Sequence, residues 1–507
     1  MLKNNFNSIT ALCLIILSIA FTSCKKDNDN KPETLVDGPN VNLYALTNDN
    51  KLLYFNARTP NNITSQATIS GLQASETIVG IDFRPATGQL YGLGSTSRIY
   101  VINPTTGVAR AINATPFTPA ITGTSFGFDF NPTVDRIRLV SSNGQNLRLN
   151  PENGAVAATD LAINGVTNAK VGSVAYTQNK AGAATTMLFD IDATTDKLYK
   201  QDPPNDGKLV EVGSLGYDID ETGGFDISPD GAAALAALSS AGKSSLYTID
   251  INSGKAAKIG DFSQQIIGIA IPTEAVAYAI SLSNELLIFN PASANPTMIS
   301  KAISGIQAGE SIIGLDMRPA NGQLYALGSS SRIYTINASS GVAAVVGTGP
   351  LTTLLLGTQF GFDFNPTVDR IRIVSNLGQN LRINPNDLAL TIDGSITLAN
   401  AAISGAAYTN NFAGATTTVL FDIDSNTDRL YKQDPPNDGV LVDVGPLGVN
   451  IESSNGFDIG GTSGIAYGIF TVGTTQRMYT VNLTSGAATA GATITPAVRA
   501  FTLGLGF

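Results

Sequence analysis

Short apolar runs separated by turn residues extend along the chain from about Val41 to its last residue. Within these runs Val, Ile, Leu, Tyr and Phe alternate with polar residues, and Pro, Asn, Asp and Gly interrupt them every few residues. A period of two is typical of strands that bury one face, and these interrupting residues are typical of tight turns. No long segment has the 3.6-residue period of an amphipathic helix, so the pattern predicts an all-β protein.

One short motif recurs along the chain with a period in the forties of residues. It consists of a Gly and an apolar residue, usually followed by Asp and a second apolar residue. In the first unit we expect four strands at 78–83, 89–95, 98–104 and 108–112. Such a period, with four short strands in each unit, predicts the blades of a β-propeller. We place the central position of the ten units at Asp82, Asp129, Ala175, Asp226, Ala270, Asp316, Asp363, Ala407, Asp458 and around Gly506.

The ten units fall into two sets of five, because residues 41–274 and residues 275–507 repeat each other. We favour two five-bladed propellers. The angle between neighbouring blades is larger in a ring of five than in a ring of ten, and a close-packed interior does not adapt easily to a different angle. The alternative is one ten-bladed ring, which the short connection IPTEA after Ala270 favours. In either case we expect terminal strands to pair and close the ring, which hides sheet edges.

The first 23 residues are typical of a secretory signal peptide, with an apolar run from Ala11 to Phe21 that is too short to span a bilayer. The following FTSC resembles a lipobox, so we expect cleavage before Cys24 and lipidation of that residue; ordinary cleavage nearby is the alternative. The polar residues 24–40 predict a flexible tether. We therefore expect an outer-membrane lipoprotein exposed at the cell surface, or alternatively facing the periplasm, that meets the membrane through its lipid alone.

Composition narrows the possible chemistry. The chain has no histidine, which excludes Ser-His-Asp and Cys-His catalysis and histidine-ligated metals. Its net charge is -10 and its basic residues do not cluster, so nucleic acid is a poor partner. Cys24 would be the only cysteine of the mature chain, which leaves no disulfide.

Two long phrases, each present twice, carry a resemblance to a known family. They are GIDFRPATGQLYGLGSTSRIYVINPTTG with GLDMRPANGQLYALGSSSRIYTINASSG, and GTSFGFDFNPTVDRIRLVSSNGQNLRLNP with GTQFGFDFNPTVDRIRIVSNLGQNLRINP. These segments resemble the hallmark segments of the domain of unknown function 4394 family, over nearly the whole range from Val41 to Phe507 as two copies. The resemblance implies domains of about half this length and implies no known reaction.

The second phrase contains a group of arginines and asparagines. Strand alternation puts Arg136 and Arg138 on one face, and Arg148 lies on the neighbouring strand. If these side chains are buried they form salt bridges between blades, which we favour; if exposed, they form a fork for a carboxylated or sulfated ligand. The full candidate set is Arg136, Arg138, Asn146 and Arg148 with their counterparts Arg370, Arg372, Asn380 and Arg382.

Two groups of aspartates are candidate metal ligands, and oxygen-only ligation would suit Ca²⁺. The first group occupies the central positions of the units: Asp82, Asp129, Asp226, Asp316, Asp363 and Asp458. These either converge in the channel or accept hydrogen bonds from the next blade, and we favour the second arrangement. The other group has the spacing D-x-D-x-x-x-D, at Asp190, Asp192, Asp196, Asp422, Asp424 and Asp428, and such turns also form without metal.

Two functions fit these features. A non-catalytic binding or scaffold propeller would hold a glycan or a partner protein at the channel mouth or on blade-top loops, and we favour this function. The alternative is a carboxylate-based glycoside hydrolase, or another histidine-free hydrolase or lyase, in the channel. Glu76 with Asp82 and Asp129, or Glu310 with Asp316 and Asp363, would then supply the acid and the base.

Overall fold

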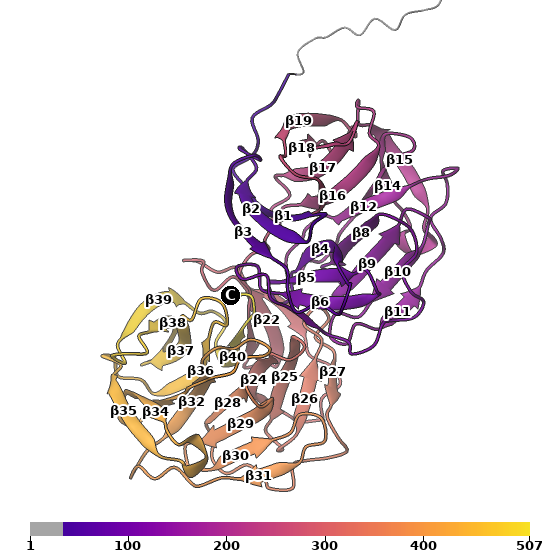
Figure 1. Cartoon of the computed structure of the whole chain (residues 1–507). Coiled ribbons are helices and arrows are strands. Elements are labelled where there is room, and N and C mark those ends of the chain that lie inside the picture. The colour runs from indigo at the N-terminus through magenta and orange to yellow at the C-terminus, as the bar shows by residue number, and fades with distance from the viewer. Residues whose placement is uncertain (1–33) are drawn as a thin grey trace, which may run out of the picture. The chain divides into compact units, whose positions relative to one another are not determined.

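The computed structural model of the protein describes residues 34–507, which form ten four-stranded antiparallel sheets (Figure 1). The described residues contain no α-helix and two single-turn 3-10 helices, η1 (Pro204–Asp206) and η2 (Pro436–Asp438). The predictions of an all-β chain and of ten four-stranded units are confirmed.

The first half holds five sheets, in the strand orders β20-β1-β2-β3, β4-β5-β6-β7, β8-β9-β10-β11, β12-β13-β14-β15 and β16-β17-β18-β19. Their bounds are β1 (Asn42–Thr47), β2 (Lys51–Asn56), β3 (Ile63–Thr68), β4 (Ile78–Arg84), β5 (Gln89–Gly94), β6 (Arg98–Ile102), β7 (Ala109–Ala111), β8 (Phe126–Asn131), β9 (Arg136–Ser141), β10 (Asn146–Leu149), β11 (Val156–Thr159), β12 (Val171–Tyr176), β13 (Leu188–Asp192), β14 (Lys197–Gln201), β15 (Leu209–Ser214), β16 (Glu221–Ile227), β17 (Ala234–Ser240), β18 (Lys243–Ile249), β19 (Ala256–Asp261) and β20 (Ile266–Ala270).

The second half repeats this arrangement, with the strand orders β40-β21-β22-β23, β24-β25-β26-β27, β28-β29-β30-β31, β32-β33-β34-β35 and β36-β37-β38-β39. Their bounds are β21 (Ala277–Ser281), β22 (Glu285–Phe289), β23 (Ile299–Ala302), β24 (Ile312–Arg318), β25 (Gln323–Gly328), β26 (Ile333–Ile336), β27 (Ala343–Val345), β28 (Phe360–Asn365), β29 (Arg370–Ser375), β30 (Asn380–Ile383), β31 (Leu390–Ile392), β32 (Ile403–Tyr408), β33 (Leu420–Asp424), β34 (Arg429–Gln433), β35 (Leu441–Pro446), β36 (Ser453–Ile459), β37 (Ala466–Val472), β38 (Thr475–Val481), β39 (Ala488–Thr493) and β40 (Val498–Leu503).

Terminal strands pair within each half. The first strand of the described chain, β1, pairs with β20, so that Ala45 lies opposite Ile269. In the second half β21 pairs with β40, and Ala279 lies opposite Phe501. The first and last strands of the described chain therefore lie in different sheets, and each half completes one sheet from its own first three strands and its own last strand.

The apolar core consists of clusters that lie between successive sheets. In the first half, Leu46 of β1 packs with Ile81 of β4, and equivalent clusters follow between each next pair of sheets. The fifth cluster joins Leu235 of β17 to Leu53 of β2, which returns to the first sheet. The second half has a corresponding series. Each half thus has its own series of clusters, and Ala86 of the first half also packs into one cluster of the second.

We call the five strands nearest the middle of each half the axial strands: β4, β8, β12, β16 and β20, and β24, β28, β32, β36 and β40. Glycines let these strands approach closely. A Cβ on Gly127 of β8 would lie 2.9 Å from the backbone nitrogen of Val174 on β12. A Cβ on Gly361 would lie 2.7 Å from the nitrogen of Ala406. Glycine two residues before the central aspartate is therefore a packing requirement.

We expect Gly127→Ala to lower the free energy of unfolding by about 1–3 kcal/mol, because the added methyl group overpacks β8 against β12. Gly349→Ala is the control, since a Cβ there meets nothing within 4 Å. Urea unfolding followed by circular dichroism measures both. Equal stability of the two variants would contradict the close approach of the axial strands.

Candidate functional site

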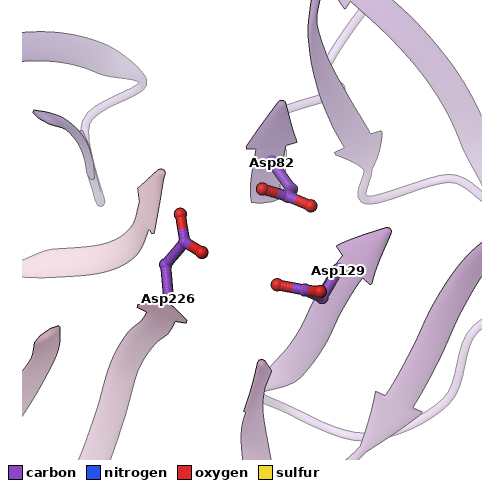
Figure 2. A group of neighbouring side chains, drawn as sticks. All are labelled: Asp82, Asp129 and Asp226. Carbon is purple, nitrogen blue, oxygen red and sulfur yellow. The ribbon is translucent and has the colours of Figure 1, made fainter. Parts of the chain in front are cut away.

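Three aspartates converge in each half. Asp82 on β4, Asp129 on β8 and Asp226 on β16 each offer one carboxylate oxygen within 4.8 Å of the others, and Figure 2 shows the three carboxylates facing one another. All three side chains are buried. In the second half the same arrangement is formed by Asp316, Asp363 and Asp458. We call these groups the first and the second triad.

Each carboxylate also ties its axial strand to the next one. Asp82 Oδ2 accepts a hydrogen bond from the N–H of Phe130 on β8, at 2.8 Å. Asp129 Oδ1 accepts one from the N–H of Tyr176 on β12, at 3.0 Å. Asp226 Oδ2 accepts one from the N–H of Ile271, directly after β20, at 2.5 Å. The second triad has the same bonds, so convergence and strand tying, which the sequence presented as alternatives, are combined.

The triads place several carboxyl groups in a medium of low polarity. Burial raises the pKa of Asp82 and Asp129 well above the usual range, and neighbouring carboxylates raise it further. Burial raises the pKa of Asp226 to about 7, although backbone N–H groups lower it. In the second triad burial raises the pKa of Asp458 to about 6 and that of Asp363 well above the usual range. Three such groups require protons or a cation at neutral pH.

In each half, the two remaining axial strands carry no aspartate at the central position. The first half has Ala175 and Ala270 there, and the second half has Ala407. The tenth position is Thr502 and not the region of Gly506, because the N–H of Leu503 binds Asp458 as the N–H of Ile271 binds Asp226. Thr502 Oγ1 also lies 3.0 Å from Asp316 Oδ1 and 2.9 Å from Asp458 Oδ2. The second triad therefore contains a hydroxyl group where the first has a methyl group.

Arg138 of β9 lies between sheets, against Tyr176 of β12. Arg138 is buried, and it donates to Asp160 and Asn146, each at 2.7 Å, to Asn205 at 2.8 Å and to Tyr176 at 3.3 Å. Arg148 forms a bidentate pair with the same Asp160. Asp160, which the sequence analysis did not select, is thus shared by two guanidinium groups, and four of the five N–H donors of Arg138 are used within the protein.

The remaining members of that set behave in the same way. Asn146 is buried and donates to backbone carbonyls of Leu161 and Pro204. Arg136 is half-buried and donates to the carbonyl oxygen of Asp135. The counterparts in the second half, Arg370, Arg372, Asn380 and Arg382, make the equivalent contacts, with Asp393 in the place of Asp160.

The D-x-D-x-x-x-D aspartates are not brought together. Asp192 accepts hydrogen bonds from the N–H groups of Lys170 and Thr194, and Asp196 accepts one from Ile219. Asp190 is buried on β13, and neither of its carboxylate oxygens has a hydrogen-bond partner. Asp422, Asp424 and Asp428 repeat these environments. Within residues 34–507, the only aspartates that group as metal ligands are the two triads.

The glutamates considered as catalytic partners lie away from the triads. Glu76 accepts hydrogen bonds from the N–H of Thr96 and the hydroxyl of Tyr100, at 3.2 and 2.5 Å. It precedes β4, whereas Asp82 lies near the end of that strand, about 20 Å further at 3.3 Å per residue. Glu310 is held by Ser330 and Tyr334 in the same way. Neither glutamate is positioned to act with the triad of its half.

The structure reveals a cleft that the sequence analysis missed. It lies in the second half between the sheets of β28 and β32 and has a volume of about 410 Å³. Its lining is rich in hydroxyl and amide groups, and two segments that occur in both halves, NPTVDR and KQDPPNDG, contribute to it. Lining residues include Asn365 and Thr367 of NPTVDR, Thr416–Thr418, Tyr408, and Lys432, Gln433, Asp434 and Pro436 of KQDPPNDG. The first half has the same residue types at Asn131, Thr133, Tyr176, Lys200, Gln201, Asp202 and Pro204.

Comparison with known proteins identifies the family. A family model described as Domain of unknown function (DUF4394) matches residues 51–270 and residues 285–503. The chain belongs to this family. Each DUF4394 copy contains one complete aspartate triad, and the second copy contains all the lining residues of the cleft. No curated protein matches the chain.

The N-terminal features stand apart from these findings. The predicted signal peptide and the predicted lipidation of Cys24 lie outside the described residues. From residue 34 onward, no helix of the DUF4394 protein is long and apolar enough to cross a membrane.

Buried Asp422 makes stability depend on pH. Burial raises the pKa of Asp422 to about 8, whereas an unfolded chain releases this proton near pH 4. The folded state therefore binds about one more proton between these values. The resulting stabilisation is complete below pH 4 and is lost as the pH rises through about 8.

Between pH 5 and 7 the unfolding free energy of the wild type decreases as the pH rises. We expect Asp422→Asn to make this slope less steep by about 1.4 kcal/mol per pH unit, because one titrating proton is removed. Asp443→Asn is the control, since an ion pair with Arg429 lowers the pKa of that exposed carboxyl. Denaturant unfolding at several pH values measures both. Parallel pH profiles of the wild type and Asp422→Asn would contradict the raised pKa.

Proposed function

We propose that each set of five sheets is a five-bladed β-propeller and that the protein is a lipid-anchored, non-catalytic binding protein of the outer membrane. In each half, an apolar cluster lies between each sheet and the next, and the fifth cluster lies between the fifth sheet and the first. This series supports five blades per ring over a ten-bladed ring. Lipidation at Cys24 would place both propellers at the cell surface, or in the alternative orientation in the periplasm.

The cleft between the sheets of β28 and β32 is the observation that carries the binding function. Its exposed threonines, with Asn365, Lys432 and Asp434, offer donors and acceptors in a concave surface. Such a lining suits a ligand with many hydroxyl groups, and we therefore propose a glycan as the ligand. A polar protein segment is the other candidate.

Catalysis has less support from the same cleft. Glycoside hydrolysis uses two carboxyl groups on either side of the scissile bond. Asp434 is the one carboxylate in the lining, and it pairs with Lys432 at 2.6 Å. The triads are buried beneath the axial strands. These arrangements favour recognition over bond cleavage.

We expect Thr416→Val and Lys432→Met to weaken glycan binding at least tenfold, because each removes a polar group of the lining while nearly preserving side-chain volume. A panel of soluble oligosaccharides tested by calorimetry against the full chain in detergent measures this. Thr475→Val, an exposed threonine on a different sheet, is the matched control. Unchanged affinity in both cleft variants would refute the cleft as the binding site, and product formation from a bound sugar would refute the non-catalytic function.

We expect Cys24→Ala to move the protein from the membrane fraction to the soluble fraction and to abolish the incorporation of labelled fatty acid. Protease treatment of intact cells distinguishes the two orientations, since only a surface-exposed protein is cleaved. Retention of the Cys24→Ala protein in the membrane fraction would contradict lipid anchoring.

A further inference from the structure

The first triad concentrates negative charge without a positive partner among the interactions that set its pKa values. For Asp129, these are burial, the carboxylates of Asp82 and Asp226, and the N–H of Tyr176. Its Oδ1 accepts that N–H, and its second oxygen remains available. Oxygens within 4.8 Å of one another fit around Ca²⁺, whose bonds to oxygen are about 2.3–2.6 Å long.

Asn179 is a second observation at this place, and the amide oxygen of its counterpart Asn411 is likewise buried without a partner. Asn179 follows β12 and is fully buried, yet neither its amide oxygen nor its amide nitrogen makes a hydrogen bond of regular geometry. The amide lies against Asp226, whose pKa it lowers. A buried polar group without a partner costs about 1–3 kcal/mol. A cation bound to the triad would give the amide oxygen of Asn179 its missing partner.

An axial hollow leads toward the first triad from the side on which the axial strands begin. Its lining comes from all five axial strands and includes Gly80, Gly127, Gly224 and Gly268, two residues before the central positions.

The second half differs at two places. Thr502 contacts the carboxylates of both Asp316 and Asp458, where the first half has Ala270. A hydroxyl group has one proton, so both contacts are hydrogen bonds only when one of these carboxyls is protonated. The corresponding hollow is also lined by Arg499, where the first half has Ile267. The proton that the Thr502 contacts require at the second triad thus opposes a cation there.

We infer that the first half binds one Ca²⁺ ion through Asp82, Asp129, Asp226 and Asn179, and that the second triad binds no ion. The ion neutralises the buried carboxylates and joins β4, β8 and β16 to the loop after β12. This site is distinct from the cleft, so its existence does not depend on the proposed glycan binding.

The experiment compares matched variants of the two halves in the full-length protein. Asn179→Leu removes one ligand and leaves an apolar side chain of similar size, and Asn411→Leu is its counterpart in the second half. Asp129→Asn and Asp363→Asn form a second pair, in which the Oδ1 acceptor for the next strand is kept. Bound metal is counted by mass spectrometry of the native protein and by elemental analysis, and calcium affinity is measured by calorimetry after removal of metal with EDTA.

We expect one calcium per wild-type chain, with affinity at least tenfold weaker in Asn179→Leu and Asp129→Asn and unchanged in Asn411→Leu and Asp363→Asn. Ala270→Thr, which introduces the hydroxyl of the second half, is also expected to weaken binding at least tenfold. Absence of calcium from the wild type, two ions per chain, or equal losses in both halves would overturn the inference. Circular dichroism confirms folding of each variant, and if Asp129→Asn does not fold, Asn179→Leu and Ala270→Thr decide the outcome.

Discussion

The hydrogen bond from a backbone N–H to the carboxylate of the preceding axial strand is the interaction on which each half depends. It joins strands that belong to different sheets, such as β4 and β8 through Asp82 and Phe130. It forms only because the glycine two residues earlier lets the strand backbones approach closely. Glycine and aspartate lie on the same strand face, since side chains alternate along a strand. The two residues of the recurring Gly-x-Asp motif therefore act together. The glycine permits close contact between axial strands, and the aspartate accepts a hydrogen bond across that contact.

This device accumulates charge at the centre of each half. Five strands meet around a narrow axis, and aspartates at the same depth on three of them bring their carboxylates together. The unfavourable free energy of burying these groups is offset by backbone hydrogen bonds, by protons and, in our inference, by a cation. The two halves achieve this differently, because Thr502 stands in one and Ala270 in the other. The two halves thus share one backbone pattern but differ in the groups that surround their buried carboxylates.

We propose that recognition is left to the outer part of the sheets. The buried arginines Arg138 and Arg372 use their donors on Asp160, Asp393 and neighbouring amides, so they support the packing between sheets. Next to this packing, the NPTVDR and KQDPPNDG segments of the second half come together and line an open cleft.

The sequence by itself determined the strands, because alternation and turn residues act over a few positions and need no distant partner. It predicted β4 to β7 nearly residue by residue, the ten units and the common position of the six aspartates. The tertiary structure alone decided what those positions contact. Asn179 reaches Asp226, and Tyr408 and Gln433 line one cleft, because packing between sheets brings together residues that no local pattern relates. The last central position fell on Thr502 for the same reason, since only the hydrogen bond between Asp458 and Leu503 reveals which residue faces the axis.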